Sequence, residues 1–301
     1  MKLLIAGGTG FIGAPLCRAL AQAGHELLIV TRTPSPGPGR NGTRFLSWEG
    51  AEWRRAMAEV DGVINLAGEP LAGKRWSPKQ KALIRESRIE TTSRLIDAIA
   101  VPARRPTVLV NASAIGYYGA HGDEELDEHE PAGRGFLADT CQAWEVEARH
   151  AETLGVRVVR LRIGVVLGPG GGAVAKMTPP FRCWIGGPLG NGRQWMSWVH
   201  LEDVLRLIEW ALTHPALSGA VNVTSPQPAT MRAFCETLGE VLKRPSWAPV
   251  PPLVLRLLLG EMAEVLLTGQ RVIPAAALRS GFAFRFPQLR SALEACLRRA
   301  A

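Results

Sequence analysis

The sequence predicts an α/β fold, in which a parallel β-sheet carries helices on both faces and a smaller lobe follows it. Three observations predict this. Short runs of Val, Ile and Leu recur through the first 165 residues, amphipathic stretches lie between them, and segments rich in Gly and Pro become frequent after Gly168. Continuous apolar runs are typical of strands buried on both faces, which occur in parallel sheets covered by helices.

Six apolar runs are expected to form the strands, and amphipathic stretches between them the helices. The strands are expected at residues 3–6, 26–31, 44–48, 62–67, 107–112 and 156–161, and the helices over 11–23, from Ser77 onward and over 136–154. Ser77 suits the N-cap of its helix and Pro78 the first turn. Residues 33–43 are rich in Pro and Gly, which predicts a loop.

Composition excludes several classes of protein. The most apolar late stretch, residues 251–269, contains Arg256, Glu261 and Glu264, so it does not suit a membrane span. The five cysteines form no C-x-x-C pair and the six histidines no H-x-x-x-H pair. We therefore expect no disulfide framework, no metal site and a reducing, cytoplasmic location.

The net charge of +8 does not indicate nucleic-acid binding. Residues 241–301 hold nine Lys and Arg against three Glu, and these charges stand singly among Leu, Ala and Pro. Basic runs interleaved with aromatic residues are absent from this segment, so a solvated basic face is favoured over a surface for an anionic partner.

A glycine motif follows the first predicted strand. Gly7, Gly10 and Gly13 have the spacing G-x-x-G-x-x-G and open the first predicted helix. Glycines let the backbone turn sharply and approach a pyrophosphate, to which a helix N-terminus offers unpaired N–H groups. This context predicts a dinucleotide-binding, Rossmann-type domain over residues 1–165.

The end of the second predicted strand indicates which dinucleotide is bound. Thr31 and Arg32 stand where an NAD site favours Asp or Glu. The guanidinium of Arg32 suits a 2′-phosphate and Thr31 adds a hydroxyl, so NADP(H) is the expected cofactor. The alternative is an ordinary surface arginine after a strand.

Several motifs together resemble the extended short-chain dehydrogenase/reductase superfamily. They are AGGTGFIG (6–13), INLAG (64–68), ASAIGYYG (112–119), LRIGVVLGPGGG (161–172) and GNGRQWMSWVHLEDV (190–204). The sequence is most similar to an atypical, epimerase-like branch of the NAD-dependent epimerase/dehydratase superfamily. Residues 266–293 resemble the small C-terminal domain of unassigned role that ends proteins of this branch, which places that domain at about 249–296.

The resemblance implies a division of the chain and a set of cofactor-binding residues. Residues 166–301 would form the smaller substrate lobe, with a return to the first domain within 195–225. The cofactor-binding residues would line the pyrophosphate, the adenosine and ribose, or the nicotinamide: Gly7, Thr9, Gly10, Phe11, Ile12, Gly13, Leu66, Ala67, Gly68, Arg88 and Ala112. For Arg88, an exposed position on the helix surface is an equal alternative.

The acid–base dyad expected of such a protein is missing. A Tyr-x-x-x-Lys pair works because the lysine lowers the pKa of the tyrosine, which makes it a usable acid or base. Here the matching positions are Phe136 and Thr140, and Tyr-x-x-x-Lys occurs nowhere in the sequence. Ala114 stands at the usual catalytic serine, with Ser113 one place earlier.

Tyr117, Tyr118 and Ser113 are the remaining candidates for catalysis. The two tyrosines, the only ones in the chain, follow a predicted strand at the edge where open α/β sheets bind ligands. One is expected to pack and one to face substrate. Glu145 is either an acid or base or a solvated helix carboxylate, and His200 is expected to be structural, with Asp203 capping the next helix.

A group of tryptophans offers a wall for substrate. Trp184, Trp195 and Trp198 would line an apolar or ring-shaped substrate, or pack in the core.

Two functions fit these observations. The first is an NADP(H)-dependent oxidoreductase or epimerase-like enzyme that acts on a small organic substrate with an unusual acid or base. The second is a non-catalytic NADPH-binding protein with a regulatory or redox-sensing role. The complete second lobe favours the first function, and the missing dyad favours the second. The sequence names neither the substrate nor the oligomeric state.

Overall fold

The computed structural model describes residues 1–33 and 42–298 of the chain. The expected loop at 33–43 therefore lies largely outside the described residues. Within them, seven parallel strands form one sheet in the order β11-β7-β5-β4-β1-β2-β3. The strands are β1 (Lys2–Ala6), β2 (Glu26–Thr31), β3 (Thr43–Ser47), β4 (Gly62–Asn65), β5 (Val108–Ala114), β7 (Arg157–Ile163) and β11 (Gly219–Val223).

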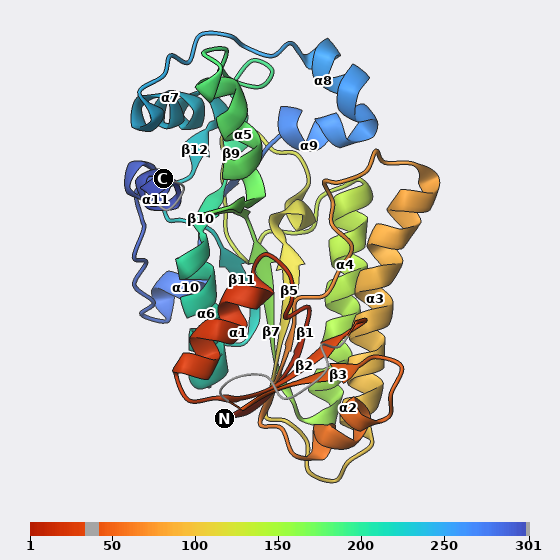
Figure 1. The fold of residues 1–301 in the computed structure, drawn as a ribbon. Helices are drawn as coiled ribbons and strands as arrows, with labels where there is room; N and C mark the ends of the chain where they lie inside the picture. Colours follow the sequence, from red (N-terminus) through yellow and green to blue (C-terminus); the bar gives the residue numbers. More distant parts are fainter. Residues whose placement is uncertain (34–41, 299–301) are drawn as a thin grey trace.

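Helices cover both faces of this sheet (Figure 1), so the predicted doubly wound α/β fold is confirmed. One face carries α1 (Gly13–Gln22) and α6 (Leu201–Thr213), which contact each other. The other face carries α2 (Glu52–Arg55), η1 (Ala56–Ala58), α3 (Pro78–Ala100), α4 (Phe136–Arg149) and η3 (His150–Leu154). Each face has its own buried apolar cluster, because alternate side chains of a strand point to opposite faces.

The second half of the chain returns to the sheet. After β8 (Val165–Gly168) it enters the smaller lobe, and β10 (Trp198–His200), α6 and β11 then bring it back, where β11 pairs with β7. The first domain is therefore not a continuous stretch of sequence. Its seventh strand comes from residues 219–223.

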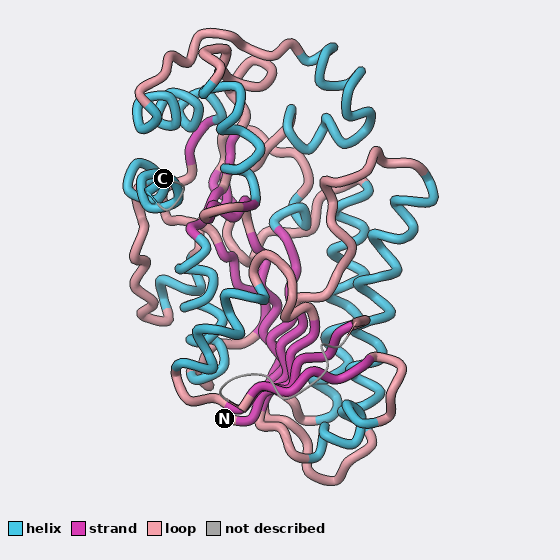
Figure 2. Tube along the Cα trace, viewed as in Figure 1, coloured by secondary structure: helices cyan, strands magenta, loops and turns pink. Residues whose placement is uncertain are grey.

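The smaller lobe lies at the carboxyl end of the strands, above the sheet in Figure 2. Its core contains Phe181, Trp198, Phe234 and Leu293, all buried. Besides β8 and β10, its elements are α5 (Gly172–Arg182), β9 (Trp195–Met196), β12 (Ala229–Thr230), α7 (Met231–Leu242), α8 (Pro252–Leu259), η4 (Gly260–Ala263), α9 (Glu264–Leu267), β13 (Arg271–Val272) and α11 (Leu289–Leu297). Helix α10 (Ala275–Arg279), which follows β13, packs instead against β11 of the sheet.

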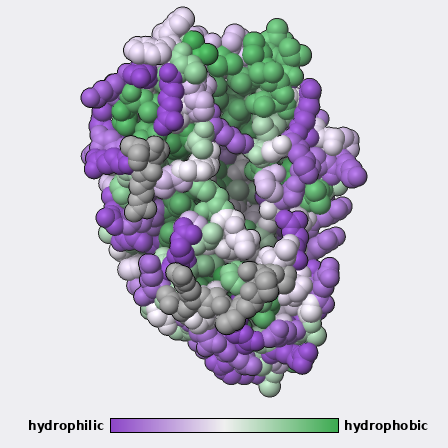
Figure 3. Space-filling view, viewed as in Figure 1, coloured by the Kyte–Doolittle hydropathy of each residue, from purple (hydrophilic) through white to green (hydrophobic). Residues whose placement is uncertain are grey.

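Apolar side chains gather on the surface at α8 and α9, in the upper right of Figure 3. Leu253, Leu257 and Leu258 are each at least two-thirds exposed. Helix α8 is only eight residues long. In the part of the chain that the structure describes, no helix combines the length and apolar character that crossing a membrane requires.

Candidate functional site

Two glycines of the motif are needed by the fold itself. Gly7 has a φ of +79°, and a Cβ there would lie 2.6 Å from the carbonyl carbon of Leu66. A Cβ on Gly13 would lie 2.1 Å from the carbonyl oxygen of Gly7. Both contacts are far shorter than real Cβ contacts, so any side chain at these two positions would push the β1–α1 turn apart.

Gly10 is different, because neither its backbone conformation nor its neighbours require glycine. A Cβ there would meet only the carbonyl oxygen of Gly7, at an ordinary 3.5 Å, and Gly10 is exposed. The missing side chain therefore leaves open space at the N-terminus of α1. A pyrophosphate needs that space to reach the backbone N–H groups, so the turn fits a dinucleotide.

The rest of the turn joins the two lobes. Thr9 is exposed and Ile12 half-buried at the start of α1. The ring of Phe11 lies against the glycine turn between β8 and α5, where a Cβ on Gly171 would approach it to 2.6 Å. Phe11 thus packs on the segment where the chain crosses into the smaller lobe, in addition to standing beside Gly10.

The end of β2 lies beside the glycine turn. Ala6 pairs with Val30, so Thr31 and Arg32 stand next to the residues that follow β1. Thr31 is half-buried, and Arg32 is exposed. An exposed guanidinium at this point suits a phosphate on the adenosine ribose.

The end of β4 lies next along the carboxyl edge of the sheet. The strand stops at Asn65, two residues before the expected end, because the N–H of Ala67 donates to Oδ1 of Asn65 (3.2 Å) and turns the chain. Arg88, on α3, donates to the carbonyls of Glu69 (3.1 Å) and Ile84 (2.7 Å).

Arg88 also packs against the backbone of the strand end. A Cβ on Gly68 would lie 3.1 Å from its guanidinium carbon, so a side chain there would have to shift Arg88 slightly. Burial lowers the pKa of Arg88. The alternative of an exposed helix cation is therefore wrong for this residue.

A buried polar network lies at the end of β5. Ala112 is almost fully buried within the sheet. Ser113, 3 % exposed, donates from Oγ to Oε1 of Glu145 (2.7 Å) on α4. Glu145 also accepts from Arg162 at both oxygens (2.9 and 3.0 Å) and from Arg160 (3.3 Å), both on β7. Glu145 is therefore a buried carboxylate held by two arginines and a serine, and the reading as a solvated helix carboxylate is wrong.

Arg162 is the centre of this network. Its guanidinium donates to the hydroxyl of Tyr118 (2.9 Å), and its central carbon lies 3.5 Å from the ring centroid of Tyr117. Burial lowers the pKa of Arg162, but the hydrogen bond and charge of Glu145 outweigh this and raise the pKa overall. The guanidinium is thus a permanent buried cation beneath both tyrosines.

The two tyrosines differ sharply in exposure. Tyr118 is fully buried, and its hydroxyl contacts the carbonyl of Asp127 and Oδ1 of Asn222 (2.9 and 2.7 Å). Burial raises the pKa of Tyr118 to about 12, which makes it a poor acid or base near neutral pH. Tyr118 is therefore the packed tyrosine and leaves the catalytic set, whereas Tyr117 is half-buried and accessible.

The residues of α4 that face the end of β5 are not the two that the sequence match to the Tyr-x-x-x-Lys dyad implies. Thr140 donates its hydroxyl to the carbonyl of Phe136 (2.7 Å), and the ring of Phe136 packs edge-on against Trp76 (5.2 Å between centroids). Leu137 lies against Gly116, and Glu145 reaches Ser113. The matching positions 136 and 140 are therefore wrong in register, because the bonds of Glu145 rotate the face of 137, 141 and 145 toward β5.

Cys141 lies on that face of α4, four residues from Leu137 and four from Glu145. Burial and the charge of Glu145 raise the pKa of its thiol to about 11. Cys141 is thus held as a neutral thiol. Sequence reasoning missed Cys141, Arg160 and Arg162, although two arginines at alternate positions of an apolar strand are a signal of a buried polar partner.

A surface hollow of about 320 Å³ lies beside the loop that follows the tyrosines. It is lined by residues 120–123, by Asn191 with residues 193–195, and by residues 267–269. The tryptophans do not form one wall around it. Trp195 lines the hollow, Trp198 is fully buried in the lobe core, and Trp184 is more than half exposed.

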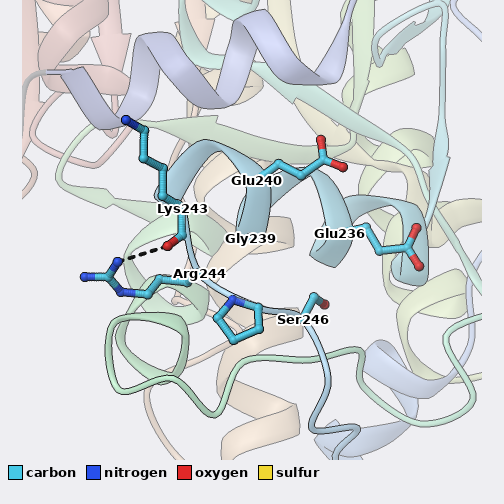
Figure 4. A pocket seen from close by; sticks show the side chains of 7 residues that line it. Glu236, Gly239, Glu240, Lys243, Arg244 and Ser246 are labelled. Atoms are coloured by element: carbon cyan, nitrogen blue, oxygen red, sulfur yellow. Dashed lines mark hydrogen bonds between the residues drawn. The ribbon is translucent and has the colours of Figure 1, made fainter.

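A larger hollow, of about 490 Å³, lies at the C-terminal end of α7 (Figure 4). It is lined by Glu236, Glu240 and Lys243 among others, and Arg244 donates to the carbonyl of Lys243 (2.9 Å). None of its lining residues comes from the strand ends, so it lies apart from the candidate site. Within the described residues no cluster of three or more His, Cys, Asp or Glu offers a metal site.

His200 is structural, as expected, but the expected helix cap is wrong. Nδ1 of His200 accepts from the N–H of Glu202 (3.2 Å), which makes His200 the N-cap of α6. Asp203 instead accepts from the N–H groups of Arg285 and Phe286 (2.7 and 2.9 Å). It therefore fastens the C-terminal segment to α6.

These features define a dinucleotide-binding protein with a second lobe over the carboxyl edge of its sheet. The sequence model of the NAD dependent epimerase/dehydratase family matches residues 3–224, and a domain of unknown function, DUF1731, matches residues 250–296. The chain belongs to the NAD dependent epimerase/dehydratase family, and the predicted family with its small C-terminal domain is confirmed.

Individual relatives cover nearly the whole chain. An Arabidopsis thaliana protein, "Epimerase family protein SDR39U1 homolog, chloroplastic", is 44 % identical over 99 % of this chain and 87 % of its own length. Human epimerase family protein SDR39U1, crystallised with NADPH, is 35 % identical, with a TM-score of 0.89 and 99 % of each chain covered. UDP-glucuronic acid 4-epimerase from Bacillus cereus, at 18 % identity and a TM-score of 0.79 over 99 % of this chain and 98 % of that one, shares the fold.

Proposed function

We propose that the chain is an NADP(H)-dependent oxidoreductase or epimerase-like enzyme that acts on a small organic substrate. The observation that carries this proposal is the space left open at Gly10 beside the exposed Arg32. The human relative crystallised with NADPH supports the same cofactor. A small-molecule substrate and a reducing compartment such as the cytoplasm belong to the same proposal.

The cofactor site would follow the carboxyl edge of the sheet. Residues of the β1–α1 turn, Gly7 and Thr9 to Gly13, would hold the pyrophosphate through backbone N–H groups. Thr31 and Arg32 would hold the 2′-phosphate. Leu66 to Gly68 and Arg88 would lie along the adenosine and ribose, and Ala112 with Ser113 would border the nicotinamide.

The chain's own residues would orient the substrate and move its proton. Bound NADPH supplies a hydride. Ser113 donates its hydroxyl hydrogen to Glu145, so its oxygen is left as an acceptor for a substrate or carboxamide N–H or O–H. Tyr117, half-buried over the Arg162 cation, is the candidate acid or base. The hollow lined by residues 120–123, which follow the tyrosines, offers room for part of a substrate.

The cofactor preference tests this proposal. We expect NADPH to bind more tightly than NADH in fluorescence titrations. Replacing Arg32 with Ala should remove most of the preference, about 1–3 kcal/mol for a charge-assisted pair.

The control is Arg149→Ala, which removes the same charge at the exposed end of α4 and should leave both affinities unchanged. Equal affinity of the unaltered chain for the two cofactors would contradict the proposed 2′-phosphate site. Binding of neither would contradict the proposed function as a whole.

A further inference from the structure

The domain of unknown function touches the loop that carries Tyr117. We name residues 115–128 the tyrosine loop; it runs from η2 (Ile115–Tyr118) through β6 (Glu125–Leu126). We name residues 269–276 the clamp segment; it contains β13 and the start of α10. The two segments are hydrogen-bonded along most of their length, although the residues that their side-chain hydrogen bonds join are between 148 and 155 positions apart in sequence.

At its N-terminal end, the clamp segment is hydrogen-bonded to the chain both before Tyr117 and after Tyr118. The side-chain amide of Gln270 donates to the carbonyl of Ile115 (2.8 Å), just before Tyr117. The N–H of His121, just after Tyr118, donates to the carbonyl of Gly269 (2.9 Å). The short turn with both tyrosines is thus fastened at each end.

At the far end, backbone pairing and a buried carboxylate continue the contact. Strand β13 pairs in parallel with β6, and the N–H of Ile273 donates to the carbonyl of Leu126 (3.0 Å). The carboxylate of Glu128, almost fully buried, accepts from the N–H of Ala276 (3.0 Å) and of Asn222 (2.9 Å). Glu128 therefore joins the tyrosine loop to α10 and to β11.

The clamp segment is itself anchored to the smaller lobe. Ser197 donates its hydroxyl to the carbonyl of Gln270 (2.7 Å) and accepts from the N–H of Val272 (2.9 Å). Val272 packs with Tyr118 and Leu126 in a separate buried cluster. A change in the clamp segment would therefore reach the tyrosine loop directly, without passing through the sheet.

We propose that the clamp segment positions Tyr117, so that the C-terminal domain completes the active site rather than being an appended module. This inference rests on the proposed function, in which Tyr117 is the acid or base. Gln270 is a positioning residue, because its side chain contacts the loop backbone and not the reacting atoms. The same domain contributes residues 267–269 to the wall of the hollow that is lined by residues 120–123 of the tyrosine loop.

Hydrogen exchange measured by mass spectrometry tests the proposal without a known substrate. Gln270→Ala removes the bond to Ile115, and Gln270→Glu keeps the side-chain size but loses the amide donor. Both should speed exchange in peptides from residues 115–126 on the order of fivefold, the effect of losing one hydrogen bond. Peptides from β1 and α1 should exchange as before, and the NADPH affinity should stay within about twofold.

Gln288→Ala is the matched control, because it makes the same substitution at an exposed position in the same domain. It should leave exchange of the tyrosine loop unchanged. With a carbonyl compound found by screening for NADPH oxidation, Gln270→Ala should lower kcat about tenfold and leave KM for NADPH unchanged.

Two outcomes would contradict the proposal that the clamp segment positions Tyr117. One is a folded Gln270→Ala variant whose tyrosine loop exchanges at the original rate, and the other is faster exchange spread evenly over the chain. Failure of the unaltered chain to bind NADPH would instead contradict the proposed function, whatever the exchange of the loop shows.

Discussion

At the scale of single residues, burial decides the chemistry of the charged groups near Ser113. Glu145 and Arg162 are each about 3 % exposed and share two hydrogen bonds. A buried pair of this kind adds little net stability compared with apolar residues of the same shape, but removing one partner leaves an uncompensated charge. The pair therefore fixes how β5, β7 and α4 pack together, but it adds little to the free energy of unfolding.

Glu145→Leu should destabilise the fold by about 3–5 kcal/mol, because Arg162 would stay buried without its anion. The measurement is the free energy of unfolding from urea titration. Glu147→Leu, two residues along the same helix and paired only loosely with His150, should cost less than about 1 kcal/mol. Similar losses in the two variants would show that Glu145 does not hold Arg162 as inferred.

Tyr117 and Phe136 test where the chemistry lies. Tyr117→Phe should lower the NADPH-dependent turnover of a carbonyl compound at least about 100-fold, the usual contribution of an acid or base. Phe136→Leu should retain turnover within about threefold, because this ring packs against Trp76 and not at the strand end. If Tyr117→Phe kept normal turnover and a folded Phe136→Leu variant were inactive, the acid or base would have to lie on α4.

At the scale of elements, the β1–α1 turn separates folding from binding. A Cβ on Gly13 would collide with the carbonyl of Gly7, whereas one on Gly10 would project into open space. The same residue type in the same motif thus has two physical roles. One glycine lets the helix pack against the strand, and the other leaves room for a ligand.

Gly10→Val should abolish NADPH binding while changing the free energy of unfolding by less than about 1 kcal/mol. Gly13→Ala should instead destabilise the fold by about 3 kcal/mol, because its Cβ has no space. Isothermal titration and urea unfolding on both variants separate the two effects. NADPH binding of ordinary strength by Gly10→Val would show that the pyrophosphate lies elsewhere.

At the scale of the whole molecule, the two lobes are joined at several points around the strand ends. Phe11 of the first domain lies on the glycine turn of the second lobe. Asp203 on α6 accepts from the backbone at Arg285 and Phe286, and Lys81 on α3 pairs with Glu261 (2.6 Å). The carboxyl edge of the sheet, where the proposed cofactor-binding residues lie, is therefore bordered by both lobes.

The sequence alone determined six of the seven strands of the sheet, the sheet class and the glycine turn. These features depend on local rules. The period of apolar residues sets which stretch is a buried strand, and the spacing of Gly7, Gly10 and Gly13 sets the shape of the turn. Each of these patterns lies within about a dozen consecutive residues, so it does not depend on contacts with distant parts of the chain.

Only the tertiary structure decided the rotation of α4, the burial of Glu145 and the packing of Tyr118. The sequence match placed Phe136 and Thr140 at the strand end, but bonds from Glu145 to β5 and β7 turn another face of the helix inward. Likewise, Gln270 meets Ile115 across 155 positions of sequence. Such contacts join segments far apart in the chain, and no local period of residue types encodes which of them meet.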